Sequence, residues 1–347
     1  MTHVRIGSRD VGPAHPCFAV AEVGINHNGS VERAFEMIVA AKQAGADAVK
    51  FQTFKADEFV ADASQTYTYR SQGQVVTESM LEMFRRYQLR PDEWRAIRQK
   101  CDDEGILFLS TPQNRTDLDL LLELGITAIK VGSDDLTNLP LIHSYATTGL
   151  PLILSSGMSD LGEVYRALDV AGALDGYPVV LLVCTSQYPT PLADTNLRRI
   201  GTLRGAFPAV PIGFSDHTQG SLAASIAVAL GACFFEKHFT LDHGLPGPDH
   251  WFSEEPGNLA AWVASIRGAE IALGSSSVRP TESELLHKRD YQRSVVAVRP
   301  IQQGEEYTTD NLGMRRVVGG GLPPSLLDYL VGRTSGKAYA PGDAISL

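Results

Sequence analysis

The sequence predicts an α/β fold in which a closed (β/α)8 barrel, or TIM barrel, precedes a small β-rich module. Eight short apolar runs, rich in Val, Ile and Phe, follow one another through the first two-thirds of the chain. Helical patterns with apolar residues at i, i+3 and i+4 separate most of these runs. Eight buried strands alternating with helices are typical of a (β/α)8 barrel, which needs about 250 residues of the 347 available. A doubly wound open sheet is the structural alternative for such a pattern.

The expected barrel elements follow in chain order. Several helices end in a glycine directly before the next strand, as at Gly45 and Gly105, because glycine takes the left-handed conformation of a helix C-cap at no steric cost. The expected strands are Cys17–Val23, Ala46–Thr53, Leu107–Thr111, Ala128–Ser133, Leu152–Ser156, Val179–Thr185, Ile212–Ser215 and Cys233–His238. The helices expected between them include Val31–Ala44, Pro91–Glu104, Arg115–Leu124, Leu139–Thr147, Leu161–Ala171 and Ser221–Leu230.

The pattern changes after Gly274. We expect a barrel domain at 1–274, a polar linker at 275–293 with a helical stretch near Glu282–Arg289, and a β-rich domain at 294–347. A domain of about 50 residues buries only a marginal core by itself. We therefore expect this last domain to dock on a larger body.

Charge and cysteine content exclude several classes of protein. The formal net charge is -10, from 30 Lys and Arg against 40 Asp and Glu, which argues against a general nucleic-acid or anionic-membrane binder. The four cysteines lie far apart without a CxxC pair and indicate a reduced, cytoplasmic protein. No apolar signal core opens the sequence, and the most apolar stretch, Ser221–Phe235, is too short to span a membrane.

Polar and ionisable side chains follow every expected strand. In a (β/α)8 barrel the catalytic groups lie at the C-terminal ends of the strands. A lone lysine at such a position is often a solvated rim charge, and a lone Ser or Thr is often a helix N-cap. Because all eight strand ends carry polar groups, the sequence predicts a polar site at this end of the barrel.

Two lysines and four hydroxyl groups among these strand ends suit a ligand that carries both a phosphate and a carboxylate. They are Lys50, Lys130, Thr111, Ser133, Ser155 and Ser215. Lys50 has two alternatives, a salt bridge within the barrel mouth and an imine-forming lysine, since a desolvated amine can attack a keto substrate.

His217 and His238 end neighbouring strands, so that their imidazoles can converge on one divalent metal ion. A buried histidine that holds a backbone carbonyl is the alternative for either of them. Glu22 follows the first apolar strand, where its carboxylate can hold a water molecule or a sugar hydroxyl, or pair with one of the lysines.

These strand ends resemble those of the sialic acid synthase family, the phosphoenolpyruvate-dependent nonulosonate synthases. The resemblance covers essentially the whole chain, because Arg293-Ser294, Gly304-Glu305 and Arg316 are similar to the antifreeze-like domain, a SAF-type β-clip, that ends this family. The resembling motifs of the barrel are Ala21–Gly29 (AEVGINHNG), Lys50–Thr53 (KFQT), Ser110–Pro112 (STP), Lys130–Ser133 (KVGS), Ser155–Met158 (SSGM), Cys184–Pro191 (CTSQYPTP), Gly213–Thr218 (GFSDHT), Glu236–Thr240 (EKHFT) and Gly247–His250 (GPDH).

The resemblance implies a reaction in which phosphoenolpyruvate and an N-acetylmannosamine-type sugar aldehyde give a nine-carbon 2-keto-3-deoxy acid and phosphate. It implies that His217 and His238 hold Mn²⁺ or Mg²⁺ and that Glu22 is catalytic. It assigns to phosphoenolpyruvate the residues Lys50, Thr111, Lys130, Ser133, Ser155 and Ser215. It assigns to the sugar the residues Gln52, Asp135, Ser186, Tyr188, Asp249 and Arg316. Arg316 would come from the partner subunit of a domain-swapped homodimer.

Three positions depart from the family pattern or bear on the sugar. Asp135 stands where the family has a glutamate, Ser186 lies in the sixth motif, and Arg315–Val318 replaces a Lys-Arg-Pro-Gly sequence. A 2,4-diacetamido-6-deoxyhexose, leading to legionaminate or pseudaminate, is therefore an alternative substrate. Another aldolase-type barrel and a non-catalytic carbohydrate-binding protein are the alternative classes.

Overall fold

The structure, a computed structural model, describes residues 3–347 apart from the side chains of residues 289 and 290. The chain divides into two compact units, Met1–Gly274 and Ser275–Leu347. Within the described residues, no helix is both long enough and apolar enough to cross a membrane.

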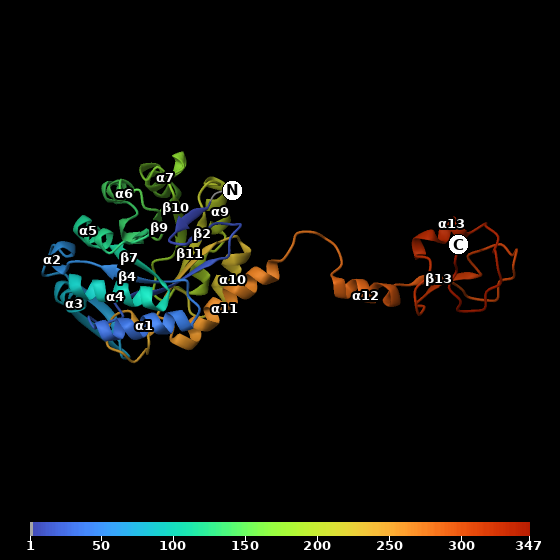
Figure 1. The fold of residues 1–347 in the computed structure, drawn as a ribbon, viewed down its shortest axis with the longest axis horizontal. Coiled ribbons are helices and arrows are strands. Elements are labelled where there is room, and N and C mark those ends of the chain that lie inside the picture. Colours follow the sequence, from blue (N-terminus) through green and yellow to red (C-terminus); the bar gives the residue numbers. More distant parts are fainter. Residues whose placement is uncertain (1–2) are drawn as a thin grey trace. The chain divides into compact units, whose positions relative to one another are not determined.

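The first unit is a closed barrel of parallel strands, which confirms the predicted (β/α)8 fold over the open sheet (Figure 1). Around the barrel the strands follow the order β10-β11-β12-β3-β4-β7-β8-β9, so the last barrel strand along the chain, β12, closes against the first, β3. Their bounds are β3 Phe18–Gly24, β4 Ala48–Thr53, β7 Leu107–Pro112, β8 Ile129–Val131, β9 Leu152–Ser155, β10 Val179–Cys184, β11 Ile212–Asp216 and β12 Phe234–His238. All eight expected strands are present.

Helices surround this barrel (Figure 1). The expected helices are confirmed as α1 Val31–Gln43, α4 Pro91–Glu104, α5 Arg115–Glu123, α6 Leu139–Ala146, α7 Leu161–Val170 and α10 Leu222–Ala229. Two further long or medium helices, α9 Arg199–Ala206 and α11 Pro256–Leu273, were not predicted. In α9 two interior glycines weaken the helical pattern, and only Ile200 and Leu203 are buried.

The N-terminal end of the barrel is closed by a hairpin that sequence patterns did not predict. Its strands, β1 Val4–Ile6 and β2 Arg9–Val11, are antiparallel and only three residues long, too short to show an alternation. Ile6 is fully buried with the barrel interior, where Phe18 stacks on Phe234 with ring centroids 5.3 Å apart. This end of the barrel is therefore apolar and filled.

The C-terminal end carries an inserted segment between β4 and β7. It contains α2 Ala56–Phe59, the antiparallel hairpin of β5 Thr66–Ser71 and β6 Gln74–Ser79, and α3 Met80–Tyr87. The tip of the hairpin is tied to the loop after β12, because the Gln72 amide donates to the Gly244 carbonyl at 2.8 Å. The insertion therefore lies against the loops at the C-terminal ends of the strands. A short α8, Leu192–Thr195, follows β10.

The second unit begins with α12, Glu282–Tyr291, in the segment expected to be a linker. Strand β13, Ser294–Ala297, pairs antiparallel with β14, Leu312–Arg315, and a short helix α13, Leu327–Leu330, follows. The unit has a small apolar core of its own, formed by Val295, Ala297, Ile301, Tyr307, Leu312, Leu330, Tyr339 and Ile345.

Candidate active site

A cavity of about 880 Å³ lies at the C-terminal ends of the barrel strands, and we call it the mouth cavity. Most of the site residues expected from the sequence line it. They are Glu22, Lys50, Gln52, Thr111, Lys130, Ser133, Ser155, Ser186, Tyr188, Ser215, His217, His238 and Asp249. The parallel strands bring these residues together because their C-terminal ends meet at one edge of the barrel.

Lys50 lies between two buried carboxylates on the floor of the mouth cavity. Its Nζ atom is 2.6 Å from Glu22 Oε2 and 3.6 Å from Glu236 Oε2, and it donates to Thr111 Oγ1 at 3.3 Å. Burial alone would lower the pKa of Lys50, but the two carboxylates outweigh it and raise this pKa. The amine is therefore protonated, as the salt-bridge alternative for Lys50 expects.

The two carboxylates beside Lys50 differ in their preference for a proton. Burial raises the pKa of Glu22, although the Lys50 charge opposes this change. Burial also acts on Glu236, but the ammonium groups of Lys50 and Lys130 outweigh it and lower the pKa of Glu236. Glu22 is thus suited to hold and release a proton, while Glu236 stays ionised.

Glu236 is a site residue that the sequence interpretation missed. It precedes His238 by two residues on β12, so both side chains face the barrel interior. The period of two along a strand was the signal that could have identified it. Its Oε1 atom accepts a hydrogen bond from Ser215 Oγ at 3.1 Å.

Lys130 lies on β8, two strands from the β4 strand that carries Lys50, and it is adjacent to β9. Its Nζ atom donates to Ser155 Oγ and to the Val131 carbonyl, both at 2.8 Å. Burial lowers the pKa of Lys130, and the nearby Glu236 charge opposes this change without outweighing it. Ser133 Oγ lies near the same strand ends and accepts from the Gly157 N–H at 3.1 Å. The floor thus offers two amines and several hydroxyl groups to one ligand.

His217 and His238 lie next to each other in the lining of the mouth cavity, at the ends of adjacent strands. Their ring centroids are 5.4 Å apart, as their positions at the ends of adjacent strands predict. His217 Nδ1 is 2.8 Å from the Thr185 carbonyl, so this nitrogen carries a proton. Burial would lower the pKa of His217, but the Cys184 thiol and the Thr185 carbonyl outweigh it and raise this pKa. Burial and the neighbouring imidazole hold the pKa of His238 well below its ordinary value, which keeps that ring neutral.

This pair of imidazoles fits a divalent cation. The buried Nδ1 atom of His238 has no hydrogen-bond partner among the described residues, and Asp249 Oδ2 lies 4.0 Å from it. Neutral imidazole nitrogens are common ligands of divalent first-row metals. No group of three or more His, Cys, Asp or Glu side chains in residues 3–347 is arranged as a metal cage. Oxygen atoms of substrate or water would have to complete the coordination of a metal held here.

Tyr188 and Asp249 form the wall beside the histidines. The Tyr188 ring centroid is 4.1 Å from that of His217. Burial and the Glu22 charge raise the pKa of Asp249 to about 7. Ser186 Oγ is buried and lacks a hydrogen-bond partner in the described part of the chain, so it is available to a ligand. Gln52 donates to Glu22 Oε1 at 3.3 Å.

Two expected sugar-binding residues are placed differently. Asp135 does not line the mouth cavity, whereas Asp134 does. The Asp135 carboxylate accepts from the Asn138 amide at 2.9 Å, within the short helical turn Ser133–Asp135 and the segment that follows it. Arg316 belongs to the second unit, where its guanidinium carbon lies 5.7 Å from the Tyr291 ring centroid.

The inserted hairpin contributes a wall that the sequence interpretation also missed. Tyr67, Tyr69 and Arg70 of β5 line the mouth cavity, and the Arg70 guanidinium lies 5.3 Å from the Trp251 ring centroid. Most residues of β5, Thr66–Ser71, are exposed, so this strand has no apolar run that would identify it in the sequence. A mouth walled by aromatic rings and an arginine is suited to a polar ligand with flat or apolar faces.

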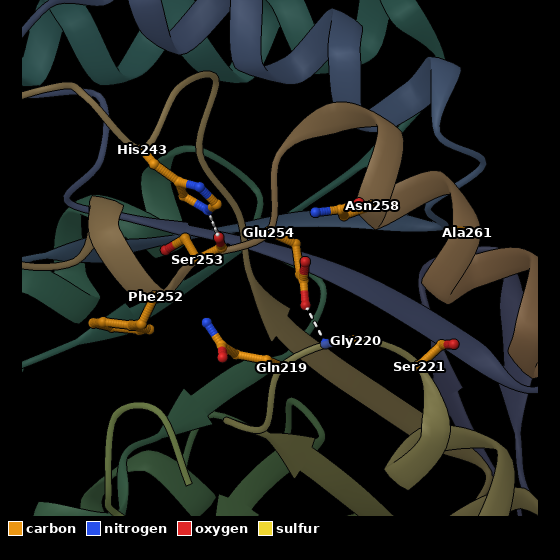
Figure 2. A pocket seen from close by; sticks show the side chains of 9 residues that line it. All are labelled: Gln219, Gly220, Ser221, His243, Phe252, Ser253, Glu254, Asn258 and Ala261. Carbon is orange, nitrogen blue, oxygen red and sulfur yellow. Dashed lines mark hydrogen bonds between the residues drawn. The ribbon is translucent and has the colours of Figure 1, made fainter. Parts of the chain in front are cut away.

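A second cavity, of about 340 Å³, lies beside the mouth cavity and shares Phe252 with it (Figure 2). His243 Nε2 is 2.5 Å from the Ser253 carbonyl, and the Gly220 N–H donates to Glu254 Oε1 at 2.8 Å. The residues that line this second cavity are Gln219, Gly220, Ser221, His243, Phe252, Ser253, Glu254, Asn258 and Ala261.

The fold and site define a (β/α)8 barrel with a polar, partly charged mouth, followed by a small β-rich unit. Residues 37–278 match the NeuB family, and residues 292–347 match the SAF domain. The chain belongs to the NeuB family, which confirms the resemblance inferred from the strand-end motifs, the terminal domain included.

Characterised relatives have the same extent as this chain. It is 39% identical to N,N'-diacetyllegionaminic acid synthase of Legionella pneumophila, over 94% of this chain and 92% of the relative. It is 36% identical to the human N-acetylneuraminate-9-phosphate synthase, over 94% and 90%. A crystal structure of N-acetylneuraminic acid synthetase from Leptospira borgpetersenii, in complex with citrate, is 31% identical with a TM-score of 0.74, over 84% of this chain and 97% of that chain. These relatives are nonulosonic acid synthases, so the family is one of enzymes.

Proposed function

We propose that this chain condenses phosphoenolpyruvate with an N-acylated hexosamine aldehyde, of the N-acetylmannosamine type, and water. The products are a nine-carbon 2-keto-3-deoxy acid and phosphate. The observation that carries the proposal is the floor of the mouth cavity, where Lys50, Lys130 and the hydroxyls of Thr111, Ser155 and Ser215 lie together. A compact trianion with a phosphate and a carboxylate needs such a set of donors.

The two lysines have different roles in this proposal. Lys50 is held protonated by Glu22 and Glu236 and attracts the anion as a fixed charge. Burial lowers the pKa of Lys130, and an anion bound beside the amine would raise this pKa again and favour its charged form. A protonated Lys50 is a poor nucleophile, which favours phosphoenolpyruvate over an imine mechanism at this residue.

The carbon–carbon bond forms between C3 of the enol phosphate and the aldehyde carbon. The aldehyde oxygen takes up a proton, while the electron-poor C2 is attacked by water. The water then loses both of its protons and the C2–O bond to phosphate breaks, which leaves the keto group at C2. One of these protons balances the proton taken up by the aldehyde oxygen, and the other leaves with the phosphate. Glu22, whose raised pKa suits it to exchange protons, is the residue we assign to the proton transfers.

A divalent ion, Mn²⁺ or Mg²⁺, would be held by His217 and His238, and when bound it would polarise the aldehyde as a Lewis acid. His217 is oriented for this by the Thr185 carbonyl, and His238 is kept neutral by burial. The chain's own contribution is to present two imidazole nitrogens toward the aldehyde end of the mouth cavity.

The sugar would lie on the outer part of the mouth cavity, against Gln52, Ser186, Tyr188 and Asp249. The buried Ser186 hydroxyl has no hydrogen-bond partner among the described residues, and it could therefore bind a polar substituent of the sugar.

We also propose that Arg316 of a partner subunit binds the N-acyl group in a domain-swapped homodimer. Arg316→Ala and His217→Ala, each inactive alone, should then recover up to about a quarter of wild-type activity when mixed and reassociated. No recovery despite verified subunit exchange would contradict the shared site.

A panel assay tests the proposal. The full chain is incubated with phosphoenolpyruvate, Mn²⁺ and one sugar at a time: N-acetylmannosamine, its 6-phosphate, or a 2,4-diacetamido-6-deoxyhexose. Phosphate release and a nine-carbon keto acid detected by mass spectrometry support the proposal, and the fastest sugar identifies the branch. Borohydride trapping of pyruvate on Lys50 or another lysine of the mouth cavity, with no phosphate released from any sugar, would instead indicate an imine-forming aldolase.

A further inference from the structure

Behind the two histidines lies a cluster of buried charged side chains that the proposed reaction does not use. Side chains alternate along β11 and β12, so that Asp216 and Lys237 point away from the mouth, toward the outer helices. The two residues are register partners, and Lys237 Nζ lies 3.0 Å from Asp216 Oδ2. Their side chains are 0% and 2% exposed, so this ion pair is shielded from water.

Asp216 holds the backbone on the far side of His217. Its Oδ1 atom accepts from the Thr218 N–H at 2.9 Å and from Thr218 Oγ1 at 2.7 Å. The bond to the Thr218 N–H closes a ring that contains the whole backbone of His217, which restricts the direction of its imidazole. Lys237 completes the arrangement by donating to the Thr218 carbonyl.

Two contacts anchor this cluster to elements distant in sequence. The indole N–H of Trp262, on α11, donates to Asp216 Oδ2 at 3.0 Å. Glu254 Oε1 lies 3.6 Å from Lys237 Nζ. The same atom accepts from the Gly220 N–H at 2.8 Å, a hydrogen bond that Figure 2 shows. The Glu254 N–H donates to the His238 carbonyl at 2.8 Å, so the same residue also holds the second histidine.

Stability alone does not account for such a cluster. Removing charges from water is costly, and well-packed apolar residues are often as stabilising as a buried ion pair. What the charged side chains provide here is direction, because their hydrogen bonds fix the backbone at Thr218 and Gly220. The backbone N–H of Glu254, whose side chain is held in the same cluster, fixes the His238 carbonyl. Residues behind metal-binding histidines commonly tune metal affinity in this way.

We propose that Asp216, Lys237 and Glu254, with Trp262, are positioning residues that set the spacing and orientation of His217 and His238 for a divalent cation. This inference rests on the metal site of the proposed function. It predicts that changes in the cluster weaken metal binding without touching the metal.

The experiment measures Mn²⁺ binding to the purified full chain without substrates, from the electron paramagnetic resonance signal of free Mn²⁺. We expect Asp216→Asn to weaken binding about 10–100-fold. Trp262→Phe, which removes one donor and keeps the aromatic ring, should weaken it less and in the same direction. If Asp216→Asn does not fold, the Mn²⁺ affinity of Trp262→Phe alone tests the positioning role.

Asp47→Asn is the matched control. Asp47 is also shielded and also joins a strand to α11, since it accepts from the Ala19 N–H at 2.8 Å and from Arg267 at 2.6 Å. It follows α1 and precedes β4, at the opposite end of the barrel from the histidines. We expect it to lower the melting temperature but to leave Mn²⁺ affinity within about twofold.

Different failures are distinguishable. Wild-type protein that binds Mn²⁺ while Asp216→Asn and Trp262→Phe bind it equally well would overturn the positioning role alone. Equal losses of Mn²⁺ affinity in Asp47→Asn and Asp216→Asn would also overturn it, because general destabilisation would then explain both. Wild-type protein that binds neither Mn²⁺ nor Mg²⁺ would overturn the histidine site itself, and this proposal with it.

Discussion

Phe18 and Glu22 lie four residues apart on β3, yet they belong to opposite ends of the barrel. At the N-terminal end, Phe18 stacks on Phe234 and the β1–β2 hairpin fills the interior. At the C-terminal end, Glu22 is paired with Lys50, and the buried Ser186 Oγ and His238 Nδ1 atoms have no hydrogen-bond partner among the described residues. A buried polar atom left in this state costs about 1–3 kcal/mol.

The same strands therefore carry residues that stabilise the fold at one end of the barrel and residues suited to chemistry at the other. The apolar end contributes burial energy and has no reactive group, while the mouth concentrates charged and polar groups, some of which lack a hydrogen-bond partner among the described residues. Groups that lack partners within the protein are available to a ligand. The apolar end therefore offsets the cost of the mouth, and the two ends should respond differently to substitution.

The largest effect should follow from opening the apolar end. Phe18→Ala removes a fully buried ring and should lower the free energy of unfolding by about 3–5 kcal/mol. The kcat of the remaining folded protein should change little, because no atom of Phe18 reaches the mouth cavity. Chemical denaturation and steady-state kinetics measure the two quantities. A large loss of kcat with an unchanged unfolding energy would contradict the division between the ends.

The opposite outcome is expected at the mouth. His217→Ala should reduce turnover by about 10²–10³-fold, which is the range for loss of one electrostatic group that acts on the transition state. The free energy of unfolding should change little, since this residue lies at the rim of the barrel. In the unmodified enzyme, chelation should abolish turnover and Mn²⁺ should restore it. Full activity after exhaustive chelation would rule out the metal.

Lys130→Ala should separate the two substrates. Loss of a charge-assisted hydrogen bond of about 1.5–3 kcal/mol corresponds to roughly 10–150-fold weaker binding of phosphoenolpyruvate. Affinity for the sugar should be nearly unchanged, as titration calorimetry with each substrate would show. Equal losses for both substrates would mean that the substitution collapses the mouth floor instead of removing one anion contact.

The smallest effect concerns a buried carboxylate at the same end that does not line the mouth cavity. Burial raises the pKa of Asp117, near the start of α5, from 3.8 to about 6. Between these two values the unfolded chain releases its proton and the folded chain keeps it, so the free energy of unfolding falls as pH rises from about 4 to 6.

Asp117→Asn should remove this decrease and add on the order of 1–2 kcal/mol above pH 6, with no gain near pH 4. Its oxygen can still accept the Asn114 N–H, which the aspartate does at 3.0 Å. Urea denaturation at pH 4 and pH 7 measures the difference. An equal gain at both pH values would show that titration of Asp117 is not the cause.

Patterns along the chain were sufficient for the barrel and for most of its mouth. Short apolar runs predicted β3 and β12 to within one residue at each end, and glycines such as Gly105 ended helices before strands. Parallel strands must end at one edge, so residues such as Lys50 and His238 could be grouped without coordinates.

Only the tertiary structure revealed the insertion between β4 and β7, the β1–β2 hairpin that closes the N-terminal end of the barrel, and the orientation of particular carboxylates. The β5–β6 and β1–β2 hairpins are short or exposed, and such strands have no apolar run of their own. Asp134 lines the mouth cavity and Asp135 does not, because both lie in the helical turn Ser133–Asp135, which directs their side chains differently. The sequence pattern did not predict where this turn begins.

Local sequence thus determined which residues stand at the ends of the strands, since strand periodicity is a property of neighbouring residues. It did not determine the partners of those residues. The ion pairs of Lys50 with Glu22 and Glu236, and of Lys237 with Asp216, join different strands, and Trp262 reaches Asp216 from a helix 46 positions away. Burial and charge balance at each group depend on such distant contacts, so only the folded barrel decides which groups are ionised, neutral or left for a ligand.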